Sequence, residues 1–205
     1  MRTPDTAPTL RAADAGDVDA IVALVDSAYR GETSRQGWTT EASLLEGQRT
    51  DVAAISAAIA SANTRLIVAM DAARQLIGCG ALERVDPERA YFGTFAVRPS
   101  QQGTGLGKRL LAEAERYARS DWGCERLELQ VIAQRTELIE WYERRGYERT
   151  GESKPFPYGD ERFGVPVRDD LYFVVLAKSL GAGAGPPEPG ASVVPAPGES
   201  SGPAM

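Results

Sequence analysis

The residues with the clearest chemical pattern form a glycine-rich turn between an apolar run and an amphipathic one. The turn is Gln102-Gly-Thr-Gly-Leu-Gly-Lys108, which follows the apolar run 95–97 and opens a predicted helix over 104–122. Glycine lets the backbone approach a ligand closely. The first N–H groups of a helix lack partners within it, and the helix dipole favours negative charge there. Such a turn can bind a pyrophosphate through backbone groups alone.

The spacing of the glycines excludes the two commonest phosphate-binding loops. A P-loop requires Gly-x-x-x-x-Gly-Lys-Ser/Thr, but here Gln102 stands at the first glycine position and Arg109 at the Ser/Thr position. The dinucleotide fingerprint Gly-x-Gly-x-x-Gly also fails, because its last glycine falls on Lys108 or Leu110. The spacing that fits is Gln-x-x-Gly-x-Gly, starting at Gln102.

Strands and helices must position this turn. The spacing of apolar residues and the helix-capping residues predict where these elements lie. Asp14 is predicted to cap a helix whose apolar face runs from Val18 to Tyr29, and Thr50 to cap one that includes 52–59. A short helix over 137–145 has Thr136 as its predicted cap and a glycine as its stop. The predicted strands cover residues 9–12, 65–70, 75–85, 91–97, 127–132, 147–151 and 171–180.

The connections between these elements predict how the strands pair. Short turns at 71–74 and 86–88 join three strands, which should be antiparallel. The strand at 91–97, the long helix and the strand at 127–132 form a βαβ unit, so these two strands should be parallel. The predicted fold is one α/β (α+β) domain with a mixed central sheet flanked by helices, in the order β-α-α-β-β-β-α-β-α-β-β.

Composition narrows the classes of function. The chain has 205 residues and a formal net charge of −6, which argues against nucleic-acid binding. No apolar run has the length of a membrane helix, and no secretory signal is visible, so we expect a cytoplasmic protein. Cys79 and Cys124 form no metal or redox motif, and no metal is expected. The chain has no histidine, so any proton transfer must use other groups.

A second motif, Trp-Tyr-Glu-Arg-Arg-Gly-Tyr over 141–147, follows the turn after the predicted long helix and one predicted strand. Together the two motifs resemble the GNAT superfamily of acyl-CoA N-acyltransferases, with its Arg/Gln-x-x-Gly-x-Gly/Ala loop and aromatic-Tyr-Glu-Lys/Arg-x-Gly-Phe/Tyr segment. The resemblance covers most of residues 9–180, the expected N-acetyltransferase domain. Residues 1–8 are expected to be a flexible N-terminus. Residues 181–205, with six Gly and six Pro and no aromatic residue, are expected to be a disordered tail.

The resemblance implies a site for acetyl-CoA as the acyl donor. Backbone groups of Phe95 and Val97, with Ala96 between them, should hold the pantetheine arm and the acyl carbonyl. The parallel strands should splay apart at 95–97 and near 132–133, and the Val97 N–H is the expected oxyanion donor. The pyrophosphate should lie on the N–H groups of the turn, which are those of Gln102, Gly103, Thr104, Gly105, Leu106, Gly107 and Lys108.

Two residues are candidates for proton transfer. Tyr142 matches the tyrosine that the family places next to the CoA sulfur, and its alternative is a core tyrosine on an apolar helix face. Some family members use a glutamate on the strand before the turn, but this chain has Tyr91 there. Glu83 on the adjacent strand is the substitute candidate for the base, directly or through water; its alternative is a solvated carboxylate. Arg135 stands where many relatives carry Asn, so a cofactor contact through that Asn is not expected here.

The acceptor should lie between two long loops, 30–49 and 154–170. Tyr29, Trp38 and Phe156 are the expected substrate-binding residues, and aromatics with both charge signs suggest a small zwitterionic or peptide-like amine. The alternative is that Trp38 and Phe156 only anchor their loops. Acetyl transfer would proceed by direct attack of the amine in a ternary complex. The alternative function is a non-catalytic acyl-CoA-binding sensor or interaction module, which the missing strand carboxylate favours. A homodimer is the default assembly.

Overall fold

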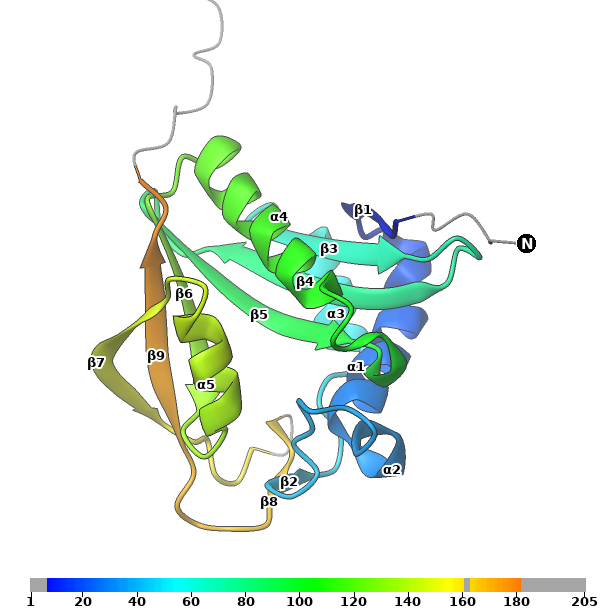
Figure 1. The fold of residues 1–205 in the computed structure, drawn as a ribbon, viewed down its shortest axis with the longest axis vertical. Helices are drawn as coiled ribbons and strands as arrows, with labels where there is room; N and C mark the ends of the chain where they lie inside the picture. Colours follow the sequence, from blue (N-terminus) through cyan, green and yellow to red (C-terminus); the bar gives the residue numbers. More distant parts are fainter. Residues whose placement is uncertain (1–6, 161–162, 182–205) are drawn as a thin grey trace, which may run out of the picture.

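The structure is a computed structural model that describes residues 7–160 and 163–181. The expected tail at 181–205, apart from its first residue, and most of the expected flexible N-terminus at 1–8 lie outside the described residues. Figure 1 shows the elements in chain order. They are β1 (Thr9–Ala12), η1 (Ala15–Asp17), α1 (Val18–Tyr29), α2 (Gly31–Ser34), β2 (Leu45–Glu46), α3 (Val52–Ala60), β3 (Thr64–Met70), β4 (Leu76–Arg84), β5 (Arg89–Val97), η2 (Pro99–Gln101), α4 (Leu106–Ser120), β6 (Arg126–Ile132), α5 (Thr136–Glu143), β7 (Glu148–Pro155), β8 (Val165–Pro166) and β9 (Tyr172–Ser179).

One mixed sheet organises the chain, as the sequence predicts. Its strand order is β1-β3-β4-β5-β6-β9-β7. The β5–β6 pair is parallel, and the pairs on either side of it are antiparallel. The predicted antiparallel run β3-β4-β5 and the predicted parallel βαβ unit are both confirmed.

A second, two-stranded sheet joins the two long loops. β2 pairs with β8 through Leu45 opposite Pro166 and Glu46 opposite Val165. The sequence does not predict these strands, because two residues are too few to show an alternating pattern. The pairing fixes the loop 30–49 against the loop 154–170, on the side of the sheet where the strands β5 and β6 diverge (Figure 1).

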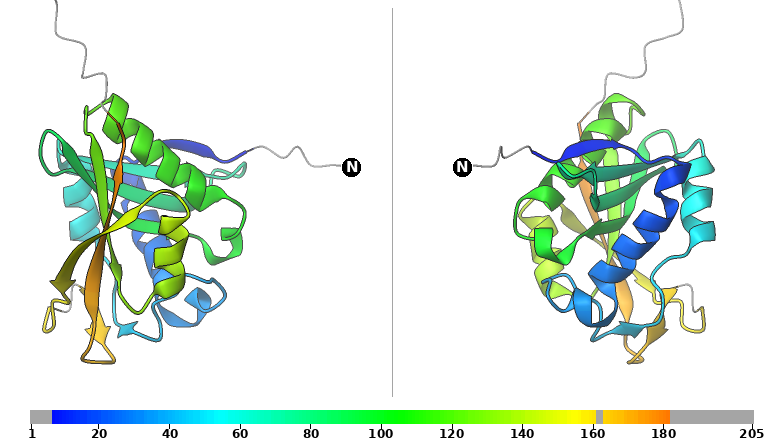
Figure 2. Two further views of the ribbon diagram at one scale, coloured as in Figure 1. Left: turned by 60° about the vertical axis from the view of Figure 1, so that its left-hand side comes forward. Right: turned by 90° about the vertical axis from the view of Figure 1, so that its right-hand side faces the viewer.

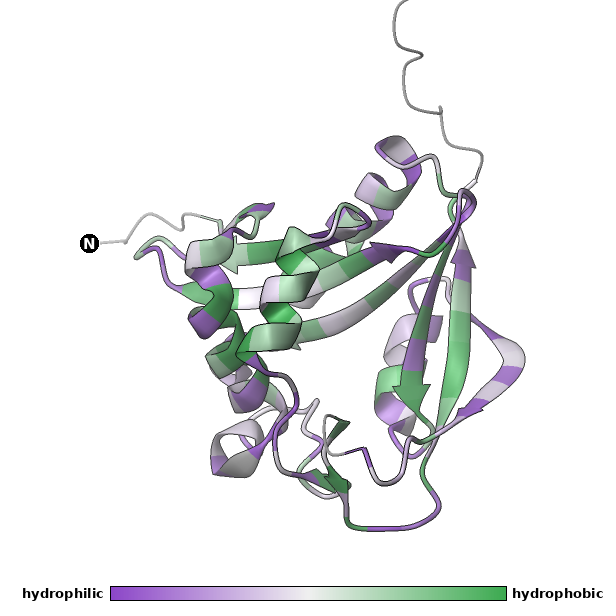
Figure 3. Cartoon of the chain, turned by 180° about the vertical axis from the view of Figure 1, so that it is seen from behind, coloured by the Kyte–Doolittle hydropathy of each residue, from purple (hydrophilic) through white to green (hydrophobic). Residues whose placement is uncertain are grey.

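The core has two apolar layers, one on each face of β3–β5. Successive residues of β3 alternate between them: Ile67 and Ala69 pack toward α4, whereas Leu66 and Val68 pack toward α1 and α3. Figure 2 shows these helices on opposite faces of the strands. In Figure 3, hydrophobic residues concentrate in the central strands, and hydrophilic ones in the outer loops and helix faces. The predicted amphipathic helix α4 buries Leu106, Leu110, Leu111, Ala114 and Ala118.

Two predicted helix caps are wrong by one residue. The cap of α3 is Asp51 rather than Thr50, because the Asp51 carboxylate accepts a hydrogen bond from the Ala54 N–H. α5 already includes Thr136, and the residue before it, Arg135, caps the helix with no side-chain hydrogen bond. The Arg135 side chain instead points away from its helix and takes part in the site described below.

Candidate active site

The parallel strands β5 and β6 part soon after they begin. They pair only through three positions, from Arg89 opposite Arg126 to Tyr91 opposite Glu128. β6 remains paired along its whole length with β9 on its other side. Among the described residues, the second half of β5 therefore has no strand partner on its β6 side, which is the divergence expected from the family resemblance.

A β-bulge in β5 lies just beyond the point of divergence. Cys79 of β4 is opposite Ala96, but Ala81 is opposite Gly93, so two residues of β5 face the single residue Gly80. One of the two, Thr94, has φ of 43°. This left-handed conformation is costly for a β-branched residue, by roughly 1–2 kcal/mol. A bulge increases the local twist of its strand, so the following residues of β5 turn away from β6.

The register beyond the bulge determines where the Val97 backbone points. The Arg98 N–H donates to the Ile77 carbonyl at 2.9 Å, which makes Arg98 and Ile77 a hydrogen-bonded pair. Hydrogen-bonded and non-bonded pairs alternate along antiparallel strands, so Val97, opposite Gly78, directs its N–H and C=O away from β4. The Val97 N–H therefore lies on the open edge of β5, where it can reach a ligand between the strands.

Gln102 connects three segments at this edge. Its side-chain amide donates to the Val97 carbonyl at 3.1 Å and to the Thr39 hydroxyl at 3.0 Å. Its side-chain oxygen accepts from the Trp38 N–H at 2.9 Å. The amide packs directly on Gly37, where an added Cβ would meet it at 2.6–2.8 Å. The side chain of the first residue of the turn thus ties the loop 30–49 to β5 and leaves ligand binding to the backbone of the turn.

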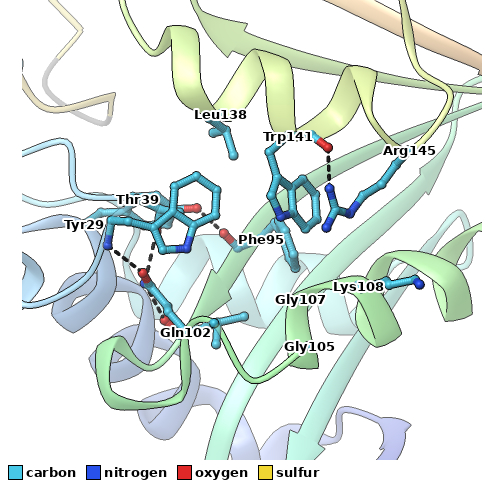
Figure 4. A pocket seen from close by; sticks show the side chains of 13 residues that line it. Tyr29, Thr39, Phe95, Gln102, Gly105, Gly107, Lys108, Leu138, Trp141 and Arg145 are labelled. Carbon is cyan, nitrogen blue, oxygen red and sulfur yellow. Dashed lines mark hydrogen bonds between the residues drawn. The ribbon is translucent and has the colours of Figure 1, made fainter.

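The glycines of the turn line a cavity of ≈ 330 Å³ (Figure 4). Gly103 and Gly105 have φ of 81° and 90°, which only glycine adopts readily. Gly105 is the residue that precedes α4. A Cβ on Gly107 would lie 3.3 Å from the Phe95 ring and 3.7 Å from the Trp141 ring. The turn therefore leaves a bare backbone surface beside the first N–H groups of α4, and this cradle fits the pyrophosphate and pantetheine of a coenzyme A.

Aromatic rings form the opposite wall of this cavity. The Trp141 ring centroid lies 6.3 Å from that of Trp38 and 6.1 Å from that of Phe95. The guanidinium of Arg145 lies over Trp141 at 3.5 Å from the centroid, and its Nε is buried without a hydrogen-bond partner. Burial and the neighbouring Arg144 lower the pKa of Arg145. Of the described residues that line the cavity, Arg145 and Lys108 are the cations.

A second, smaller cavity of ≈ 80 Å³ lies between the diverging strands. It shares Tyr29, Phe95 and Leu138 with the first cavity, so the two adjoin. Tyr142 lines it and is only 4% exposed, with its ring edge-on to Trp141. Burial raises the pKa of Tyr142 well above its ordinary value, so its hydroxyl keeps its proton.

Tyr29 lies at the junction of the two cavities. Its hydroxyl donates a short hydrogen bond to the Phe95 carbonyl at the bulge. The guanidinium carbons of Arg49 and Arg135 each lie 5.5 Å from its ring centroid. Burial raises the pKa of Tyr29, and the charge of Arg135 opposes this shift. Tyr29 therefore links the open edge of β5 to a group of charged side chains in the second cavity.

That group is centred on Glu41, which is 3% exposed. The Glu41 carboxylate lies 2.8 Å from Arg30, 2.8 Å from Arg135 and 3.3 Å from Arg49. Burial disfavours the ionised form of Glu41, but the charges of Arg49, Arg135 and Arg30 outweigh burial and lower its pKa. Arg135 also donates to the Thr39 carbonyl at 2.6 Å, so it holds the loop 30–49 against α5.

The structure brings most of the expected site residues to the two cavities. The first cavity is lined by Tyr29, Trp38, Phe95, Val97, Gln102, Gly103, Gly105, Gly107 and Lys108. The second is lined by Tyr142 and Phe156, with Tyr29 and Phe95 again. The side chains of Ala96 and Leu106 face the core. Thr104 is exposed, and its hydroxyl donates to the Gln101 carbonyl.

Glu83 lies elsewhere. It is exposed on β4 opposite Tyr91, and it lines neither cavity. Glu41, by contrast, is buried in the second cavity, although no motif in the sequence points to it. In the sequence it is one more acidic residue of a polar loop, and only its contacts with arginines distinguish it.

A glycine-rich turn at a helix start, beside the open edge of a diverging parallel strand, suits a protein that binds an acyl-CoA thioester. The Acetyltransferase (GNAT) family matches residues 24–147 of the chain. This is more than half of its length, and the chain belongs to this family.

One similar protein is an acetyltransferase. The mycothiol acetyltransferase of Salinispora tropica is 32% identical over an alignment of 164 positions, which covers 73% of this chain and 50% of the relative. The chain thus spans about half the length of that protein.

Two solved structures show the fold. Spermidine N-acetyltransferase from Vibrio cholerae, in complex with CoA and spermine, has a TM-score of 0.63 at 19% identity, over 84% of this chain and 95% of that one. Ribosomal-protein-S18-alanine N-acetyltransferase from Escherichia coli has a TM-score of 0.63 at 15% identity, over 85% and 94%.

Among the residues that the structure describes, no helix has the length and apolar character needed to cross a membrane. Within the same residues, no three Asp, Glu or Cys side chains gather as a metal site would require.

Proposed function

We propose that the chain transfers an acetyl group from acetyl-CoA to a primary amine of a small molecule or peptide. The open edge of β5 at Val97, next to the turn at the start of α4, is the observation that carries this proposal. Family membership supports it, and the similar proteins named above act on amines. The amine would enter from the second cavity and the thioester from the first, so that the two meet at the junction formed by Tyr29, Phe95 and Leu138.

The reaction has a simple balance of bonds. The neutral amine forms a bond to the acyl carbon, the carbon–sulfur bond breaks, and CoA leaves as a thiolate that acquires a proton. The amine gives up a proton to water or to a base. The Val97 N–H is the proposed donor to the oxygen that becomes negative during attack, because its strand offers it no other partner on the β6 side.

Tyr142 is the proposed hydrogen-bond donor to the departing thiolate. An ordinary phenol has a pKa near ~10 and a thiol near ~8.5, so full proton transfer is already uphill by roughly 2 kcal/mol. Burial raises the pKa of Tyr142 further, which strengthens the case for a hydrogen bond without complete transfer. This role needs only a neutral hydroxyl beside the sulfur.

Replacing Tyr142 by Phe tests this role. We expect kcat to fall about 100-fold, the lower end of the range typical of a single positioned acid–base group, while the Kd for acetyl-CoA stays within about twofold. Turnover would be followed by thiol release and Kd by calorimetry. Tyr147→Phe is the matched control, because Tyr147 is also buried but bonds to Glu115. Equal losses of kcat and acetyl-CoA affinity in Tyr142→Phe would indicate that Tyr142 only packs.

Glu83 remains the proposed base, acting through water. It lies opposite Tyr91, which lines the second cavity, and its charge contributes to raising the Tyr91 pKa, although burial of Tyr91 is the larger cause. The buried Glu41 is a poor base, since its arginine partners hold it ionised. Glu83→Gln should reduce turnover at neutral pH and recover as the pH approaches the pKa of the amine. An unchanged pH profile would remove Glu83 from the mechanism.

A non-catalytic acyl-CoA sensor is the second candidate function. The feature that favours it is the lack of an acidic residue among the described residues that line the first cavity. Melting temperature with and without acetyl-CoA, measured beside thiol release over a panel of amines, separates the two functions. A rise in melting temperature with acetyl-CoA, together with turnover of an amine, supports the enzyme. The same rise without turnover of any amine supports the sensor. The cytoplasm is the proposed compartment, in keeping with two free, buried cysteines.

A further inference from the structure

The charges of the second cavity do not balance. One carboxylate, Glu41, contacts three guanidinium groups, and arginine stays protonated at all ordinary pH values. Within the part of the chain that the structure describes, Glu41 is the only acidic residue lining this cavity. The group formed by Glu41, Arg30, Arg49 and Arg135, here called the arginine cluster, therefore carries two positive charges in excess.

Several N–H groups of the arginine cluster also lack partners. Among the described residues, Nε and Nη2 of Arg30 are buried without a hydrogen bond, and Nε of Arg49 is buried with only an ion-pair contact to Glu41 at 3.3 Å. Unpaired buried donors and uncompensated buried charge are both costly. An anion that enters the cavity would offset both costs, because it supplies negative charge and hydrogen-bond acceptors.

Arg49 is the member of the cluster that is free to bind such an anion. Arg30 does not line the cavity. Arg135 is 10% exposed and already uses both terminal nitrogens, on Glu41 and on the Thr39 carbonyl. The Arg49 side chain is 34% exposed and approaches Glu41 only through Nε, at 3.3 Å. Within the described residues, its two terminal nitrogens have no partner, which leaves the fork that binds a carboxylate in two-pronged geometry.

The cluster lies next to the position of transfer. The Tyr29 ring that contacts Arg49 and Arg135 carries the hydroxyl that bonds the Phe95 carbonyl. An anion on Arg49 is thus about one tyrosine side chain away from the open edge of β5. An acceptor whose anionic group lies a few bonds from its amine can reach both places at once.

We propose that Arg49 binds a carboxylate of the acceptor, so that the substrates are small amino acids or other amines with a carboxylate close to the amine. This inference rests on the proposed function and specifies its substrate class. The cavity of ≈ 80 Å³ suits one small group, and its aromatic walls, including Phe156, suit an apolar body. The excess positive charge disfavours polyamines, whose additional ammonium groups it would repel.

A panel of matched acceptors tests the proposal. Phenylalanine and leucine are compared with their amides and with the corresponding amines that lack the carboxyl group. The amine pKa of the amide is lower, and that of the decarboxylated amine higher, than that of the amino acid. A preference for the amino acid over both therefore cannot come from the fraction of neutral amine. We expect kcat/KM to favour the amino acids by about 10- to 100-fold, the range of one charge-assisted contact.

Variants of Arg49 locate the effect. Arg49→Met should remove the preference, mainly through KM for the amino acids, and lower kcat/KM for the decarboxylated amines much less than for the amino acids. Arg49→Lys should retain part of it, because the charge remains but the fork is lost. Arg35→Met is the matched control, since Arg35 belongs to the same loop and its exposed side chain lines neither cavity. The melting shift with acetyl-CoA should persist in all three variants.

Calorimetric binding of phenylalanine to the protein saturated with CoA separates this inference from the proposed function. Binding that Arg49→Met abolishes, without turnover on any amine, would support the anion site and overturn the enzyme. Three results would overturn the anion site but not the proposed enzyme activity. They are equal turnover of acceptors with and without the carboxylate, a preference for polyamines, and an equal loss of turnover for all acceptors in Arg49→Met.

Discussion

Replacing Gln102 by alanine should loosen the wall that carries Trp38. The change removes three hydrogen bonds, to the Trp38 N–H, the Thr39 hydroxyl and the Val97 carbonyl. A typical hydrogen bond contributes a net 0.5–1.5 kcal/mol or so to the free energy of unfolding. Trp38 is 42% exposed, so water can replace part of what is lost. Three such bonds together contribute about 1.5–4.5 kcal/mol, and we expect a destabilisation in the lower half of this range, about 1.5–3 kcal/mol.

For a domain of this size, 1 kcal/mol corresponds to about 2–4 °C in melting temperature. Gln102→Ala should therefore melt roughly 3–12 °C lower, by calorimetry or by circular dichroism. Because Trp38 lines the first cavity, the Kd for acetyl-CoA should rise by about tenfold, equivalent to roughly 1.4 kcal/mol. Gln101→Ala is the matched control, since no side-chain hydrogen bond of Gln101 joins these segments.

Gly37→Ala should disrupt the same Gln102 contacts by a different change. The added Cβ would displace the Gln102 amide, which lies within 2.6–2.8 Å of it. The double variant should then lose much less than the sum of the two single losses, as expected for a shared interaction. A melting temperature within 1 °C of the parent protein and an unchanged Kd in Gln102→Ala would refute the bracing role. Additive losses would refute the shared contact.

Two further predictions concern the cavities. Gly107→Ala should leave the melting temperature within about 2 °C of the parent, because alanine favours helices, but weaken acetyl-CoA binding, since its Cβ enters the cavity beside Phe95; equal affinities by calorimetry would contradict this. Glu41→Gln should cost about 3–5 kcal/mol in urea unfolding, because three arginines lose their buried counter-charge. Because folding lowers the pKa of Glu41 from its ordinary value of 4.5, ionised Glu41 stabilises the fold at pH values above 4.5. This contribution is lost as the pH falls below 4.5 toward the lowered pKa. The variant should lose less stability than the parent between pH 5 and 3, and parallel pH profiles would contradict the assignment.

The fold was largely predictable because its signals are local. The helical spacing of apolar residues in α4 and the short turns on both sides of β4 depend on contiguous residues. Helix caps were less predictable, because Thr50 and Asp51 are both good capping residues and only their backbone geometry selects Asp51. The strands β2 and β8 could not be predicted, since each has two residues and exists only because the other loop lies beside it.

The residues of the site also fall into those that a local sequence pattern predicts and those that only tertiary contacts bring together. The sequence by itself determined the glycine-rich turn, the helix that follows it and the placement of Tyr142 on α5, because glycine spacing and helical period are properties of short segments. Only the tertiary structure decided that the Gln102 side chain braces the loop 30–49, that Thr94 bulges from β5, and that Glu41 gathers three arginines. Glu41 and Arg135 are 94 positions apart. The charge of such a cluster depends on which distant segments the sheet brings together, and no local pattern records that.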